Sequence, residues 1–221
     1  MYSSVLSIRG ERMFILGFIY LISVLFFTTL ILKSNHKILI MKFLCIILLI
    51  YKTIEYTIYG LNLEVSKIPI EYSTISYFIF SVTAIFNFKK LNSIASFIAF
   101  ISGVGYLLAF SLVGHIFIEE QGFNITLIAL INHTILFLGS MIMISHHKIE
   151  LNESKNIFKF TTIYLLYVIA LNMFFDFSKE NIFIQMLLGM SFEGIDESFM
   201  SYAYLFYFLL LVLIYSAIIK L

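Results

Sequence analysis

Long apolar runs separated by short polar stretches form the dominant pattern of this chain of 221 residues. A run of about 20 predominantly apolar residues has the length of a helix that crosses a membrane. The pattern predicts seven such helices, at approximate residues 13–32, 38–60, 69–88, 91–113, 123–146, 160–175 and 202–220. We therefore expect an all-α, polytopic membrane protein in which residues 1–221 form a single domain.

Local signals refine these boundaries. No small-residue cleavage site follows the first run, so we expect a retained spanning helix and not a signal peptide. Pro69 suits the first turn of the third helix, where its missing N–H costs nothing. The polar stretches 115–122 and 148–159 predict loops, and the acidic segment 176–201 predicts an interfacial piece.

The fourth predicted helix has small residues at four-residue spacing, at Ala95, Ala99 and Gly103. Such a stripe lets the backbone of another helix approach closely. We therefore expect this helix to lie at the centre of the bundle.

Basic residues set the expected orientation, because cytoplasmic loops are enriched in Lys and Arg. With the N-terminus outside, the inner side would hold Lys33, Lys37, Lys42, Lys89, Lys90, Lys148, Lys155, Lys159 and Lys220. The outer side would hold Arg9, Arg12, Lys67 and Lys179. This bias favours an N-out, C-in arrangement.

Composition supports a membrane location and limits the partners. The chain is 61% hydrophobic and 12% charged, whereas about 25% of the residues of soluble domains are charged. A net charge of +1, with no basic stripe, argues against a nucleic-acid partner. We expect a multi-pass membrane protein, and nothing in the sequence indicates a cofactor.

His133 is an ionisable residue about ten positions inside the apolar run 123–144. At about 1.5 Å of rise per residue it lies roughly 15 Å into the helix, near the middle of a bilayer. Such a group should face the bundle interior and have a partner. It is either a structural histidine bonded to a neighbouring helix or part of a functional site.

Lys52 and Glu55 lie one turn apart in the second predicted helix, so they can form an ion pair that lowers the cost of burying both. A proton or ion pathway would use the same arrangement. No metal site is expected, because the adjacent His146 and His147 point in different directions and Cys45 is the only cysteine.

The segment Glu71-Tyr72-Ser73-Thr74 offers the best partner for His133. A hydroxyl beside an imidazole can lose its proton during attack on an acyl carbon, which makes a nucleophile–base pair. The alternative is that these hydroxyls bond to backbone carbonyls, as Ser and Thr in membrane helices usually do.

A resemblance supports the catalytic interpretation. The segment Ile68-Pro-Ile-Glu-Tyr-Ser-Thr-Ile-Ser76 is similar to the Leu-Pro-Leu-His-Leu-Cys-x-Leu-Ser segment of YwaF-type bacterial integral membrane proteins. These proteins are relatives of a eukaryotic multi-pass acyltransferase family that acts on ether phospholipids. Asn132-His133 resembles the mid-membrane Ser/Asn-His pair of the family. The asparagine that ends the next helix of the family resembles Asn172, and the asparagine of the turn after it resembles Asn181. An acidic residue in the family's second helix resembles Glu55.

The resemblance implies a bacterial plasma-membrane protein in which Ser73 is the acyl acceptor and His133 the general base. Ser73 stands at the position of the family cysteine, and Glu71 stands at that of the first histidine. Asn132 or Asn172 would donate a hydrogen bond to the oxyanion. The alternatives are a small transporter or channel with Lys52, Glu55 and His133 along a polar route, and a lipid-binding protein without chemistry.

Overall fold

The computed structural model describes residues 2–69, 71–147 and 153–175, and this part of the chain is all helical. The α-helices are α1 (Tyr2–Leu32), α2 (Lys37–Leu61), α3 (Tyr72–Phe86), α4 (Asn92–Gln121), α5 (Phe123–His146) and α6 (Ser154–Phe174). Two short 3-10 helices precede α3 and α4, η1 (Val65–Lys67) and η2 (Lys89–Leu91). The predicted helix at 202–220 and the interfacial segment 176–201 lie outside the described residues.

Three of the described helices are long and apolar enough to cross a membrane. Their candidate spans are Ile15–Leu32, Lys89–Leu112 and Phe123–His146, and α3 is a shorter apolar helix. The predicted range of the fifth helix, 123–146, agrees with α5 at both ends.

The chain divides into two compact units. The first comprises residues 1–51 and 76–147, and the second comprises residues 52–75 and 148–221. Both α2 and α3 continue from one unit into the other, so each unit contains parts of them.

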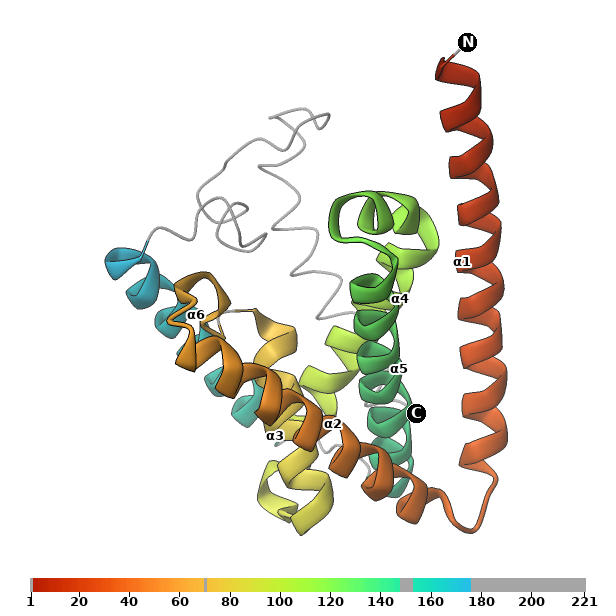
Figure 1. Ribbon diagram of the computed structural model, residues 1–221. Helices are drawn as coiled ribbons and strands as arrows, with labels where there is room; N and C mark the ends of the chain where they lie inside the picture. Colours follow the sequence, from red (N-terminus) through yellow and green to blue (C-terminus); the bar gives the residue numbers. More distant parts are fainter. Residues whose placement is uncertain (1, 70, 148–152, 176–221) are drawn as a thin grey trace. The chain divides into compact units, whose positions relative to one another are not determined.

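In the first unit, α4 packs against α5, and α1 packs against α4 (Figure 1). The contact between α4 and α5 is close because Gly103 has no side chain. A Cβ atom built on Gly103 would lie 2.6 Å from the backbone nitrogen of Phe137. Ala95 and Ala99 are fully buried on the same helix, which confirms the predicted small-residue stripe. The central place of this helix in the whole bundle stays a prediction.

The second unit is held by aromatic contacts around the start of α3. The rings of Tyr72 and Tyr164 meet edge to face at 5.0 Å between centroids. The hydroxyl of Tyr167, on α6, donates a hydrogen bond to the backbone carbonyl of Pro69 at 3.3 Å. The start of α3 and the middle of α6 therefore belong to one packed unit.

The predicted position of Pro69 in the first turn of a helix is wrong. Helix α3 begins three residues later, at Tyr72, and Ile68 before the proline is extended with φ −55° and ψ 136°. A proline ring clashes with an α-helical residue before it, so the chain turns here before it can become helical.

The predicted loops at 115–122 and 148–159 are also partly wrong. Helix α4 continues to Gln121, and Gly122 alone separates it from α5. Gly122 has φ 85° and ψ 155°, a conformation open essentially to glycine only. The hydroxyl of Thr126 donates to the carbonyls of Phe117 and Gly122, both at 3.0 Å, which fixes the corner. Helix α6 similarly begins at Ser154, within the second predicted loop.

We predict that Gly103→Ala lowers the unfolding temperature of the purified protein in detergent. The added methyl group must push α4 and α5 apart, and such overpacking costs about 1–3 kcal/mol. Gly105→Ala is the matched control on the same helix, because a Cβ there has no neighbour within 4 Å. Circular dichroism measures both unfolding temperatures. Equal values for the two variants would contradict the close contact between α4 and α5.

Candidate functional site

His133 lies at the centre of a buried polar cluster in the first unit, with 6% of its surface exposed. Its Nδ1 atom lies 2.9 Å from the backbone carbonyl oxygen of Ser102, on α4. Its Nε2 atom lies 2.9 Å from the hydroxyl of Tyr77, on α3. The prediction that His133 faces the interior and has partners on neighbouring helices is therefore confirmed.

These two bonds define the tautomer of the imidazole. A carbonyl oxygen can only accept, so Nδ1 has the proton and donates it to Ser102. In the neutral ring, Nε2 then has a lone pair and accepts the proton of the Tyr77 hydroxyl. The ring therefore presents a basic nitrogen to a hydroxyl group.

Two tyrosine rings enclose the imidazole. The ring of Tyr106 stacks on it with centroids 4.2 Å apart and planes 1° from parallel. The ring of Tyr77 meets it edge-on at 5.6 Å. The enclosure restricts both the orientation of the imidazole and the access of water.

Further polar atoms lie on the same helices. The hydroxyl of Ser76 donates to the hydroxyl of Ser102 at 3.0 Å. Asn132 is buried, and within the described residues its side-chain nitrogen has no hydrogen-bond partner. The buried hydroxyl oxygen of Tyr106 also has none. Both are polar groups that a bound molecule could satisfy.

Ser73 and Glu71 lie together at the start of α3, in the second unit. The hydroxyl of Ser73 donates to the carboxylate of Glu71 at 3.2 Å. Next to them, the hydroxyl of Tyr56 donates to that of Thr74 at 3.0 Å. Because Ser73 belongs to the second unit and His133 to the first, the predicted Ser73–His133 pair stays a prediction.

The predicted ion pair between Lys52 and Glu55 is present on α2, with 2.6 Å between Nζ and Oε2. Lys52 is buried and Glu55 is mostly buried, so the pairing lowers the cost of enclosing both charges. Asn172 lies in α6, but its side chain and the whole of Asn181 lie outside the described part of the chain.

Sequence analysis missed three groups around His133: the Tyr77 hydroxyl, the Tyr106 ring and the Ser102 carbonyl. A signal existed for Tyr77, because a tyrosine deep inside an apolar helix usually needs a partner for its hydroxyl. The stacked ring of Tyr106 had no such signal, since its hydroxyl has no partner in the described part of the chain. The carbonyl has no such signal, since every residue has one.

Comparisons of this chain with protein-family models, with curated proteins and with solved structures found no match.

We predict that Tyr77→Phe destabilises the protein, because it leaves Nε2 of His133 without its tyrosine partner in a buried site. A buried polar atom deprived of its partner costs about 1–3 kcal/mol. Tyr106→Phe is the matched control, since it keeps the stacked ring and removes a buried hydroxyl that has no partner. Thermal unfolding of both variants in detergent measures the difference. A Tyr106→Phe variant as unstable as Tyr77→Phe would show that the Tyr77–His133 bond contributes little.

Proposed function

We propose that this chain is a YwaF-type multi-pass protein of the bacterial plasma membrane that transfers or hydrolyses the acyl groups of membrane lipids. In this proposal the chain crosses the membrane seven times, with its N-terminus outside and its C-terminus inside. The exposed apolar side chains of α1 support a lipid environment. Phe18, Ile22 and Phe26 are each at least 51% exposed, and an apolar surface of this kind is unfavourable in water.

The observation behind the chemical proposal is the arrangement of His133. A general base needs an unprotonated nitrogen aimed at a hydroxyl, and a second group that fixes the ring in this tautomer. The Ser102 carbonyl and the Tyr77 hydroxyl hold His133 in this state. A histidine that served only to join two helices would also need two partners, so a chemical experiment must separate the two roles.

The proposed reaction uses Ser73 as the acyl acceptor. Its Oγ forms a bond to the acyl carbon of a lipid ester while His133 takes its proton at Nε2 in place of the Tyr77 proton. The ester bond then breaks, and the imidazolium returns the proton to the leaving alcohol. Water or the hydroxyl of a second lipid attacks the acyl-serine in turn, which completes hydrolysis or transfer.

The remaining predicted residues have supporting roles in this scheme. The Asn132 amide, whose nitrogen has no partner among the described residues, suits an oxyanion donor, and Asn172 is the alternative. Glu71 orients the Ser73 hydroxyl through their hydrogen bond.

Transport of protons or ions is the second candidate function. The observation in its favour is the buried Lys52–Glu55 pair, because ionisable groups inside membrane helices are costly and often mark an ion pathway. Lys52, Glu55 and His133 would then lie along a polar route. A lipid-binding protein without chemistry would need neither the base nor the pathway.

A lipid-like fluorophosphonate tests the catalytic proposal, because it reacts covalently with an activated hydroxyl. We predict that mass spectrometry finds the phosphonyl group on Ser73 of the purified protein. His133→Ala and Ser73→Ala should both lower the labelling at least tenfold, since the base contributes about 10²–10⁴-fold to such chemistry.

Thr57→Ala is the control and should leave the labelling of Ser73 unchanged. Its hydroxyl is exposed and donates to the carbonyl of Thr53 within its own helix. Labelling on Tyr77 would transfer the role of acyl acceptor to that residue. Absence of labelling from a folded protein would reject the enzyme and favour transport or lipid binding without chemistry.

The orientation can be tested with single cysteines in a Cys45→Ser background, at Gln121, the last residue of α4, and at Lys90, in η2 just before α4 begins. Gln121 and Lys90 are both exposed. We predict that Gln121→Cys reacts with an impermeant maleimide on intact cells, because it lies on the proposed outer side. Lys90→Cys should react only after permeabilisation. The opposite pattern would reverse the proposed topology.

A further inference from the structure

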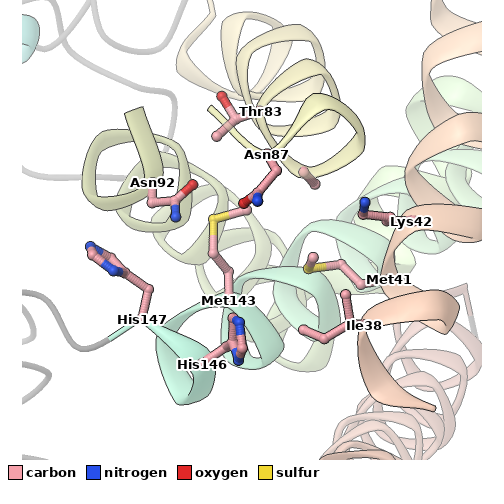
Figure 2. A pocket seen from close by; sticks show the side chains of 10 residues that line it. Ile38, Met41, Lys42, Thr83, Asn87, Asn92, Met143, His146 and His147 are labelled. Carbon is pink, nitrogen blue, oxygen red and sulfur yellow. The ribbon is translucent and has the colours of Figure 1, made fainter. Parts of the chain in front are cut away.

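A cavity of about 100 Å³ lies within the first unit, where α2 and α4 begin and α3 and α5 end (Figure 2). Its apolar wall includes Met41, Ala84 and Met143, and its polar groups include Lys42, Asn87 and Asn92. None of the groups proposed above for acyl chemistry or transport lines it, so it is a separate site.

The charge of the lining selects an anion. None of the described residues that line the cavity is acidic, and Lys42 supplies the one permanent positive charge among them. Lys42 is partly buried and has no ion-pair partner in the described part of the chain. The helix dipoles favour neither an anion nor a cation here, because two helices begin at the cavity and two end there. A cation would meet the ammonium without any compensating carboxylate.

The polar groups around the cavity can donate several hydrogen bonds. Asn92 is 8% exposed, and its amide and that of Asn87 point toward each other, with the end of the Met143 side chain between them (Figure 2). Asn87 has φ 56°, a left-handed conformation that asparagine tolerates better than most residues. Together with the Lys42 ammonium, the two amides suit an anion with several acceptor oxygens.

The size of the cavity suits a phosphate group. Its volume of about 100 Å³ is several times the minimum of about 10–15 Å³ that one water molecule needs.

Apolar surroundings indicate that the anion belongs to an amphiphile. Leu39 and Phe43 flank Lys42 on α2 and are 67% and 61% exposed. Phe86 and Phe88, on either side of Asn87, are exposed and stack on each other at 5.9 Å. Acyl chains attached to an anion at Lys42 would find apolar contacts on both sides.

We infer that this cavity binds the phosphate of an anionic phospholipid of the phosphatidic acid type. Lys42 supplies the charge, and Asn87 and Asn92 supply amide donors. The inference rests on the membrane location proposed above but not on acyl chemistry.

The test is a calorimetric titration. The protein, in a non-ionic detergent, is titrated with dihexanoyl phosphatidic acid. Dihexanoyl phosphatidylcholine and inorganic phosphate serve as comparison ligands. We expect the phosphatidic acid to bind at least about tenfold more tightly than either, because only it combines an unshielded phosphate with apolar chains.

Three variants identify the site. Lys42→Gln should weaken binding about tenfold or more, as expected for a lost hydrogen bond to a charged group. Asn87→Asp should weaken it at least as much, because it places a negative charge at the cavity and keeps the shape of the side chain. Lys90→Gln, a charge-matched control at an exposed position outside the cavity, should change binding less than about twofold.

Equal losses in Lys42→Gln and Lys90→Gln would overturn the inference, because they would indicate general attraction to a basic surface. Inorganic phosphate that binds as tightly as the lipid would overturn the assignment to a lipid, and absence of saturable binding would overturn the site. If Lys42→Gln does not fold, the exposed Asn87→Asp variant decides. Lys42→Gln should leave fluorophosphonate labelling of Ser73 unchanged, so the two proposals fail independently.

Discussion

A buried imidazole needs a partner for each of its two nitrogens, and this requirement joins three helices of the first unit. His133 on α5 obtains one partner from α4 and the other from α3. The partner on α4 is a backbone carbonyl, which already accepts from the amide four residues later and uses its second lone pair for the imidazole. Such a bond requires the two helix backbones to come close together.

Gly103 makes this approach possible. It follows Ser102 directly on α4, and it contacts Phe137, which lies one turn after His133 on α5. The missing side chain at 103 and the bond at 102 are therefore neighbouring parts of one helix contact. Apolar packing and hydrogen bonding act together here, because a wider separation would lose both.

Sequence alone predicted the features that depend on periodicity and on the cost of burial. The limits of α5, the stripe of Ala95, Ala99 and Gly103, and the Lys52–Glu55 pair all follow from residue spacing along one helix. The interior position of His133 followed from the high free energy of an imidazole in hydrocarbon. Partners on other helices could not be predicted in this way. The Ser102 carbonyl has no sequence signal, and the motif resemblance directed attention to Ser73 and away from Tyr77.

Helix ends were predicted less well, because polar residues in the sequence do not distinguish a loop from the end of a long helix. The stretch 115–122 includes His115, Glu119 and Glu120 and suggested a loop, but a single glycine makes the corner. This corner has a consequence for insertions and deletions. Surface loops usually absorb a change of length, whereas here one added residue between Ser102 and Gly122 would rotate α5 by about 100° relative to α4. The imidazole would then turn away from its carbonyl, so a stretch with the composition of a loop should tolerate substitutions but no change in length.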